Sequence, residues 1–285
     1  MTPIPVADII KLPMDFITKL KKAIKKNNSL VCVGLDPDLE RMPTGLSVAE
    51  FNKAIIKATA DLVGAYKLNL AFYEVLGIEG LETLMQTIKY IPQDILVIGD
   101  AKRGDIANTA RAYAQTIFTN FNFDATTVNP YLGFDSIEPF IQYRDKGVFL
   151  LCRTSNSGAA DFQDLPCQVA GGTRPLFEIV AARANEWNSN GNIGLVVGAT
   201  YLEELRRIRQ SYPDMPLLIP GIGAQGGDLP RVVSYGVDRQ AERTLINSSR
   251  QIIYASPEKD FARAARQAAS SLREEINRHL PTLPA

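Results

Sequence analysis

The sequence predicts a TIM-type (β/α)8 barrel, an α/β fold in a single domain. Eight short, apolar, β-rich runs alternate with longer segments of helical periodicity. This alternation covers about 250 residues, which favours a barrel over an open doubly wound sheet. No low-complexity linker divides the chain, and 285 residues with 46% apolar content can bury a large core.

The predicted strands are short, β-rich runs. They span residues 29–34, 65–70, 95–99, 125–129, 148–152, 193–197, 216–219 and 244–247. The run 95–98 is wholly apolar, so we expect it to form a buried strand.

The segments between the strands show apolar residues at helical spacing. They span residues 48–63, 78–90, 106–121, 137–144, 174–187 and 202–210, with a last helix at 258–279. Residues 1–28 are expected to form a helical extension over the bottom or side of a barrel at 29–256. Residues 155–173 are the one long irregular stretch, which suggests a functional loop or an insertion.

The balance of charged residues argues against partners that bind through the net charge of the whole protein. Lysine plus arginine and aspartate plus glutamate both total 31, so nothing attracts nucleic acid polymers or an anionic membrane. Lys21, Lys22, Lys25 and Lys26 form a small basic run, but apolar residues between them indicate the solvated face of an amphipathic helix. We therefore expect a small ligand that is recognised locally.

The numbers of cysteines and histidines indicate the cellular compartment and exclude some kinds of catalytic or metal site. The three cysteines lack metal-type spacing and fit a reducing cytoplasm, and the single histidine, His279, argues against a histidine triad or a zinc site with several imidazoles. No segment approaches about eighteen apolar residues, and no apolar stretch precedes the lysine run. Neither a membrane span nor a signal peptide is expected.

The most informative segment is Asp-Ala-Lys-Arg-Gly-Asp-Ile at 100–106, directly after the apolar run 95–98. Side chains alternate along a strand, so Asp100 and Lys102 should point to the same side, while Asp105 lies where the next helix begins. One lysine then has two carboxylates within reach. Clusters of this kind at strand ends are candidates for catalysis, and the alternative is a salt bridge with an Asp N-cap.

Two further charges are expected near this cluster. Lys67 interrupts the apolar pattern of the second strand and, if it points into the barrel, joins Asp100, Lys102 and Asp105; otherwise it faces the helical layer. Asp36 follows the first strand, and residues just after the strands of a barrel converge on one face.

The loops after the last two strands resemble a phosphate site. Pro-Gly-Ile-Gly-Ala-Gln-Gly-Gly-Asp follows the seventh strand and Asn-Ser-Ser-Arg the eighth. Glycines let backbone N–H groups approach an anion, and a guanidinium can bind it with two hydrogen bonds. Gln225 and Arg250 are the side-chain candidates, and the amides around Gly223 and Ser249 are the backbone candidates. After the fifth strand, Ser155 could hydrogen-bond a neutral heterocycle or cap its loop.

Taken together, Asp100-x-Lys102-x-x-Asp105-Ile106-x-x-Thr109, Lys67, the glycine-rich loop and Arg250 resemble the orotidine 5'-phosphate decarboxylase family. The resemblance covers residues 29–256 and is greatest to its longer bacterial branch. The motif Asp-x-Lys-x-x-Asp alone is shared with the related hexulose-phosphate synthase group. Ser157 departs from the family, in which proline is common after Asn156, and residues 161–173 look like an insertion.

This resemblance implies conversion of orotidine 5'-phosphate to uridine 5'-phosphate and CO2, the last step of de novo pyrimidine synthesis, without a cofactor or metal. Lys102 would protonate the pyrimidine C6 position, and Asp100 would lie against the substrate carboxylate. Lys67 would hold Asp100 and a ribose hydroxyl, and Asp36 would also bind the ribose.

The resemblance also implies the remaining contacts and a homodimer. Asp105, with Ile106 and Thr109, would enter the neighbouring subunit's site. Gln225 and Arg250 would bind the phosphate, and Ser155 would face the pyrimidine ring.

Three other functions fit parts of the pattern. A sugar-phosphate aldolase or synthase would bind magnesium through carboxylates, but the ammonium group of Lys102 would compete with the metal for them. A Schiff-base enzyme would need a lysine with a low pKa, whereas paired carboxylates raise it. A barrel that only binds nucleotides has no use for all four residues Lys67, Asp100, Lys102 and Asp105.

Overall fold

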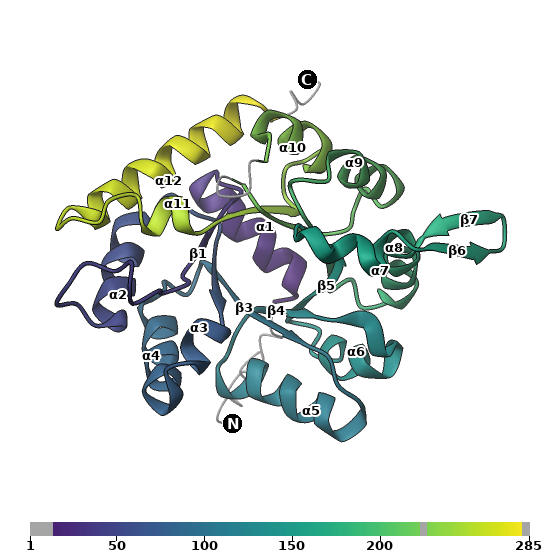
Figure 1. Ribbon diagram of the computed structural model, residues 1–285, viewed down its shortest axis with the longest axis horizontal. Helices are drawn as coiled ribbons and strands as arrows, with labels where there is room; N and C mark the ends of the chain where they lie inside the picture. The colour runs from purple at the N-terminus through teal and green to yellow at the C-terminus, as the bar shows by residue number, and fades with distance from the viewer. Residues whose placement is uncertain (1–13, 223–226, 281–285) are drawn as a thin grey trace, which may run out of the picture.

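The computed structural model describes residues 14–222 and 227–280, and its centre is a closed barrel of eight parallel strands (Figure 1). The strand order around the barrel is β1-β10-β9-β8-β5-β4-β3-β2. The barrel strands are β1 Val31–Gly34, β2 Ala65–Asn69, β3 Leu96–Arg103, β4 Ala125–Val128, β5 Gly147–Arg153, β8 Ile193–Val197, β9 Leu217–Pro220 and β10 Thr244–Ser248. The predicted fold class is confirmed, and every predicted strand overlaps an observed one.

Helices alternate with the strands and form the outer layer of the barrel, as Figure 1 shows. The longer helices are α2 Val48–Thr59, α4 Gly77–Tyr90, α5 Ala107–Gln115, α6 Phe134–Ile141, α8 Leu176–Trp187, α9 Leu202–Ser211, α10 Leu229–Gly236 and α12 Phe261–Arg278. Shorter ones are α3 Ala71–Glu74, η2 Pro130–Leu132 and α11 Arg250–Ile253. Because helices cover the strands from outside, β1, β4 and β8 are buried at every position.

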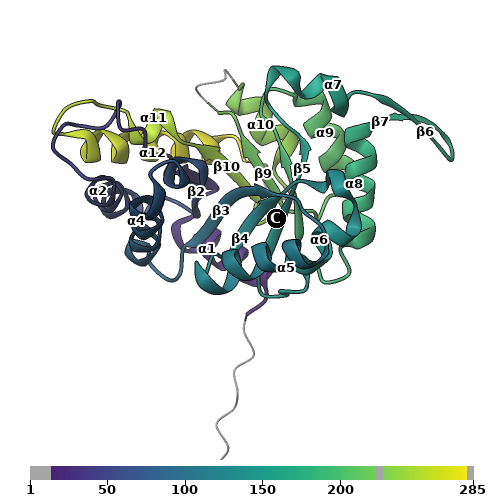
Figure 2. The same ribbon diagram turned by 60° about the horizontal axis from the view of Figure 1, so that its bottom comes forward.

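An N-terminal helix, α1 Phe16–Asn27, closes the amino end of the barrel (Figures 1 and 2). The carboxylate of Asp15 accepts a hydrogen bond from the backbone N–H of Thr18 and caps this helix. The ring of Phe16 packs edge-on against Phe149 and occupies the space that a side chain at Gly147, the first residue of β5, would need. The part of the predicted extension from residue 14 onward therefore covers the bottom of the barrel.

The stretch after β5 is more ordered than the sequence indicates. It contains the short helices η3 Ser157–Ala159 and α7 Ala160–Gln163, then the antiparallel strands β6 Pro166–Val169 and β7 Gly172–Pro175. This hairpin projects from the barrel in Figure 2. The expectation of an irregular stretch was wrong because these elements, of three or four residues each, are too short for a periodic apolar pattern.

Other boundaries differ for local reasons. The predicted helix 106–121 begins at Ala107 and changes at Thr116 into a π-helical turn, η1 Thr116–Asn120. α10, whose first turn contains Pro230, was not predicted. Within residues 14–222 and 227–280, no helix combines the length and the apolar character that crossing a bilayer requires.

Candidate active site

The carboxyl end of β3 presents Asp100 and Lys102 to the barrel mouth. The Lys102 ammonium lies 2.7 Å from Asp100 Oδ1, so the predicted pairing of these two side chains is confirmed. Simple alternation does not produce it, however. The register between β3 and β4 shifts between Gly99 and Arg103, and Lys102 has a φ of 47°, a left-handed conformation that costs a non-glycine residue about 1–2 kcal/mol.

Thr127 on β4 stabilises this bulge. Its hydroxyl accepts a hydrogen bond from the backbone N–H of Lys102 at 3.0 Å and donates one to Asp100 Oδ1 at 2.8 Å. One side chain therefore fixes both the strained backbone of Lys102 and the carboxylate that pairs with its ammonium. Strained residues of this kind persist only where their neighbours hold them, and they cluster at functional sites.

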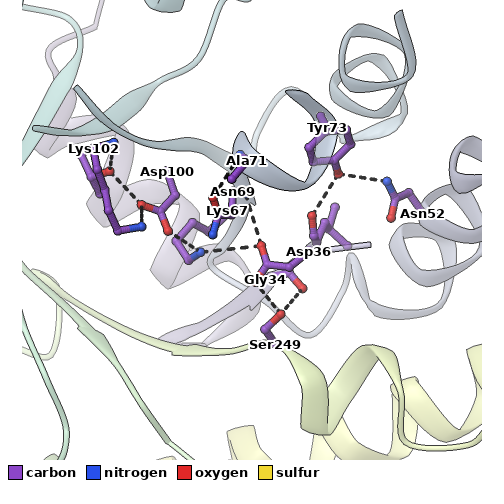
Figure 3. Close-up of polar contacts among 12 residues, drawn as sticks. Gly34, Asp36, Asn52, Lys67, Asn69, Ala71, Tyr73, Asp100, Lys102 and Ser249 are labelled. Carbon is purple, nitrogen blue, oxygen red and sulfur yellow. Dashed lines mark hydrogen bonds and ion pairs between the residues drawn. The ribbon is translucent and has the colours of Figure 1, made fainter. Parts of the chain in front are cut away.

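Lys67 points into the barrel, as predicted. Its side chain is buried on β2, with Nζ 2.9 Å from Asp100 Oδ2 and 3.8 Å from Asp36 Oδ1. Figure 3 shows the resulting row Lys102, Asp100, Lys67, Asp36, in which positive and negative charges alternate. A buried ammonium is tolerated here because carboxylates lie on both sides of it.

Neighbouring charges in this row keep both Asp100 and Lys67 in their charged forms. Burial opposes the charged form of Asp100, but the ammonium groups of Lys67 and Lys102 outweigh it and hold the pKa of Asp100 well below its usual range. Burial likewise opposes the charge on Lys67, and Asp36 and Asp100 outweigh it, which raises the pKa of Lys67 above its usual value. At neutral pH, therefore, Lys67 is an ammonium and Asp100 a carboxylate.

Asp36 is held in place by the strand ends around it (Figure 3). Its Oδ2 accepts a hydrogen bond from the Ser249 hydroxyl at 2.7 Å, and its Oδ1 accepts one from the backbone N–H of Asn69 at 3.2 Å. Beside it, the buried Tyr73 hydroxyl donates to the carbonyl of Leu35 at 2.9 Å. Ser249 thus serves Asp36 through its side chain, a contact that sequence reasoning missed.

Two cavities open at this end of the barrel. The lysine cavity, of about 960 Å³, is lined by Lys67, Asp100, Lys102 and Thr127 among others, and its remaining wall is largely apolar. The arginine cavity, of about 430 Å³, is lined by Asp36, Arg41, Ser249 and Arg250 among others. Ser155, Pro220 and Asn247 line both, so the two cavities adjoin.

The structure therefore brings most of the predicted site residues together. Lys67, Asp100, Lys102, Asp36, Ser155, Ser249 and Arg250 all line one or both cavities. Gly223 and Gln225, the other predicted phosphate contacts, lie outside the described residues.

Asp105, Ile106 and Thr109 stand apart from this group. No ion pair links Asp105 to Lys102 within the part of the chain that the structure describes. The Asp105 carboxylate instead accepts a hydrogen bond from the N–H of Ile106 at 2.8 Å, and α5 has no side-chain cap. Ile106 and Thr109 are exposed. Among the described residues of this chain, then, Lys102 has one carboxylate partner rather than two, and Asp105 is not the helix cap of the alternative interpretation.

Thr127, Asn247 and Arg41 are among the residues at the site that were not predicted. Asn247 is a buried residue of β10 whose Oδ1 has no hydrogen-bond partner among the described residues, although it adjoins both cavities. An unpaired buried acceptor is costly, so a bound ligand that donates a hydrogen bond would stabilise it. Asparagine at the end of the predicted last strand was the only available signal for it.

A closed (β/α)8 barrel with an ionised lysine–aspartate row at the carboxyl ends of its strands defines a class: barrel enzymes whose chemistry takes place at that face. The adjoining arginine cavity contributes the guanidinium groups of Arg41 and Arg250. The model of the "Orotidine 5'-phosphate decarboxylase / HUMPS family" matches residues 29–265, and the chain belongs to this family. The resemblance inferred from the motifs is thereby confirmed.

Individual relatives agree over nearly the whole chain. An orotidine 5'-phosphate decarboxylase of Dehalococcoides mccartyi is 54% identical over 266 residues, which cover 93% of this chain and 98% of the relative. One from Thermomicrobium roseum is 52% identical, covering 93% of this chain and 96% of the relative. The solved structure of Leishmania donovani OMP decarboxylase has a TM-score of 0.81 and 43% identity, covering 93% of this chain and 99% of that one.

Proposed function

We propose that this protein is a carbon–carbon lyase that decarboxylates orotidine 5'-phosphate to uridine 5'-phosphate and CO2 in pyrimidine nucleotide synthesis. The observation that carries this proposal is the Asp100–Lys102 pair, 2.7 Å apart, on the wall of a cavity that adjoins an arginine-lined one. A nucleotide with a ring carboxylate at one end and a phosphate at the other would place its carboxylate near the Lys102 ammonium and its phosphate near the Arg250 guanidinium. The volumes of the two cavities lie in the range usual for ligand sites.

In the proposed reaction, Lys102 is the proton donor. Loss of CO2 from a pyrimidine carbon leaves an electron pair in the plane of the ring, where the ring π system cannot delocalise it. An ammonium fixed beside that carbon stabilises the developing carbanion and then protonates it. The side chain of Lys102 is half exposed to the cavity, so it can reach a ligand while Asp100 orients it.

Asp100 would press against the carboxylate of the bound substrate. Two like charges about 4 Å apart at an effective dielectric constant of about 20 repel by about 4 kcal/mol. Released in the transition state, this energy corresponds to about a thousandfold in rate. Most of the acceleration must therefore come from the preorganised charge of Lys102 and from binding of the phosphate and ribose.

The remaining contacts follow the two cavities. Asp36 and Lys67 bind ribose hydroxyls, and Ser155, at the junction of the cavities, faces the pyrimidine. Arg250 and the backbone of Ser249 bind the phosphate. Gly223 and Gln225 are proposed as its other ligands.

No cofactor or metal is proposed. A magnesium-dependent synthase, the alternative within this family, needs carboxylate oxygens that are free for a metal. Both oxygens of Asp100 already accept hydrogen bonds from ammonium groups, those of Lys102 and Lys67. We expect activity to survive a strong chelator.

We further propose that the working unit is a homodimer in which Asp105, Ile106 and Thr109 complete the neighbouring site. The loops after the adjacent strands β3, β4 and β5 carry a group of exposed apolar side chains. These are Ile106, Tyr131, Leu132, Phe134, Phe162 and Leu165. Exposed apolar side chains that gather on one face mark interaction surfaces, and Tyr131 and Phe162 of this group also line the lysine cavity.

Two broader proposals complete the assignment. The three cysteines are free thiols, which fits a reducing compartment, the cytoplasm. The substrate is a small nucleotide rather than a nucleic acid polymer, and one barrel domain carries the whole of one subunit's contribution to the site.

The first test is to follow the absorbance of orotidine 5'-phosphate with the wild type and with Lys102→Ala. The wild type should produce uridine 5'-phosphate, and the variant should lose activity by at least about 1,000-fold because it lacks both the charge and the proton. Lys89→Ala, which removes an exposed lysine of α4, should leave the rate unchanged. Equal rates for the wild type and Lys102→Ala would refute the proposed proton donor.

A further inference from the structure

The insertion after β5 is anchored to the barrel by a buried arginine. Arg153, the last residue of β5, is 2% exposed. Its Nη2 lies 2.9 Å from Asp164 Oδ2, its Nη1 donates to Gln163 Oε1 at 3.3 Å, and its guanidinium lies 3.6 Å from the centre of the Tyr201 ring. α7 therefore folds back onto the end of the strand instead of extending outward with the hairpin.

Both polar atoms of the Gln163 amide contact Thr154, the residue that follows Arg153. Its Oε1 accepts a hydrogen bond from the backbone N–H of Thr154 at 2.9 Å, and its Nε2 donates to the Thr154 hydroxyl at 2.8 Å. Two hydrogen bonds from one planar amide fix both the main chain and the side chain of Thr154. Thr154 directly precedes Ser155, which adjoins both cavities.

The end of β8 holds the same segment from the other side. The N–H of Gly198 donates to the carbonyl of Arg153 at 2.7 Å. A Cβ placed on Gly198 would lie 2.8 Å from the Cβ of Ser155, closer than real Cβ atoms approach. Residues 153–155 are thus fixed between Gly198 and the amide of Gln163, and Ser155 has little freedom to move.

We propose that Gln163 is a positioning residue for pyrimidine recognition: it acts through Thr154 to aim Ser155 at the base. The insertion is then a working part of the site, and Phe162 and Gln163 form part of the lysine cavity wall. This inference rests on the proposed function, because it takes the ligand to be a pyrimidine nucleotide. In this proposal, the segment after β5 supports recognition of the pyrimidine base and does not contribute to binding of the phosphate.

The test is a double-mutant cycle with steady-state kinetics on orotidine 5'-phosphate. Gln163→Ala should lower kcat/KM by about tenfold or more, since it removes two hydrogen bonds that orient Ser155. Ser155→Ala should have a similar effect, and the double variant should be no worse than Ser155→Ala, because residues that act through one another are not additive. Fully additive losses would overturn the proposal.

Two controls separate positioning from general damage. Gln168 lies in the hairpin of the same insertion and donates only to the Thr173 hydroxyl, so Gln168→Ala should stay within about twofold of the wild type. Binding of ribose 5-phosphate, measured by calorimetry, should be unchanged in Gln163→Ala while that of uridine 5'-phosphate falls. Equal losses for both ligands would show that the site as a whole is distorted and would contradict base positioning.

A conservative variant guards against a folding defect. In Gln163→Glu the carboxylate can still accept from the Thr154 N–H and from Arg153. The Thr154 hydroxyl can donate to it by giving up its hydrogen bond to Asn156 Oδ1. This variant should recover most of the activity that Gln163→Ala loses; no recovery in a folded protein would count against the proposal. Absence of turnover by the wild type itself would refute the proposed function, whereas additivity in an active enzyme refutes only this inference.

Discussion

Asp100 is the residue on which the charge row depends, since it contacts Lys67, Lys102 and Thr127. Replacing it by asparagine leaves two ammonium groups with one nearby carboxylate, Asp36. Breaking a buried ion pair in this way costs about 3–5 kcal/mol. We expect urea unfolding of Asp100→Asn at pH 7 to show a loss of this order.

The pH dependence of that loss follows from the low pKa of Asp100 in the folded protein. A depressed carboxyl pKa contributes stability that is complete above the unfolded value, about 3.9, and disappears as the pH falls toward the folded value. The difference between wild type and Asp100→Asn should therefore be constant from about pH 5 to pH 9 and shrink below about pH 4. A difference that grows on acidification would contradict the assigned ionisation.

A substitution at Asn247 should affect ligand binding without lowering the stability of the protein. Because its buried Oδ1 has no partner among the described residues, Asn247→Leu removes an unsatisfied acceptor and should leave thermal stability unchanged or higher. If a ligand donor pairs with this oxygen, KM for orotidine 5'-phosphate should rise by about tenfold.

Asn192 provides the matched control for Asn247. It is also buried, and it precedes β8 at the other end of the barrel, where its Nδ2 donates to the carbonyls of Ile141, Tyr143 and Lys146. Asn192→Leu should cost stability and leave KM unchanged. A loss of stability without a change of KM in Asn247→Leu would mean that Asn247 is structural.

At this scale, the sequence predicts the residues of the charge row and misses the neutral side chain that holds two of them, Thr127. Lys67, Asp100 and Lys102 stand out because a charge in or beside an apolar strand is expensive. Thr127 lies in a β-rich run in which threonine is ordinary, so its two hydrogen bonds become visible only in three dimensions. The side-chain role of Ser249 depends on β1 and β10 being neighbours, which closure of the barrel decides.

At the scale of elements, the bulge at the end of β3 links backbone strain to chemistry. Thr127→Val keeps the shape of the side chain but removes both hydrogen bonds that hold Lys102 and Asp100. We expect kcat to fall by about 10–100-fold with little change in KM, because the phosphate and ribose contacts remain. Steady-state kinetics on orotidine 5'-phosphate measures both constants.

The adjacent Thr126 is the control for this prediction. It is equally buried on β4, and its hydroxyl donates to the carbonyl of Gly99 at 2.8 Å and to no side chain of the charge row among the described residues. Thr126→Val should cost comparable stability and leave kcat unchanged. Equal losses of kcat in both variants would attribute the effect to weaker β3–β4 packing instead of to the bulge.

Strand positions were predictable because apolar runs of four to six residues recur between helical segments, but the functional end of β3 was not. The predicted strand stops at 99, whereas β3 continues to Arg103 through charged residues that do not resemble a strand. The segment after β5 stands out in the sequence for its length and its glycines. Arg153 holds this segment through contacts with Gln163 and Asp164. Such contacts leave no apolar periodicity in the sequence, so they could not be predicted from it.

At the scale of the whole molecule, the position of Asp105 makes the oligomer a testable part of the site. If Asp105 serves the neighbouring subunit, each site takes Lys102 from one subunit and Asp105 from the other. Lys102→Ala and Asp105→Ala should then each be inactive as homodimers. In a mixed dimer, one site lacks both groups and the other has both. Random pairing makes about half of the dimers mixed, so an equal mixture should recover about a quarter of wild-type activity.

The control for this experiment uses two lesions from the same subunit. Lys102 and Asp100 are paired within one chain, so a mixture of Lys102→Ala and Asp100→Ala contains no intact site in any combination and should stay inactive. Subunits should be exchanged by unfolding and refolding the mixture, and mixed dimers confirmed by native mass spectrometry. Recovery in the first mixture alone requires Asp105 to act across the interface; confirmed mixed dimers without recovery would place Asp105 in its own subunit's site.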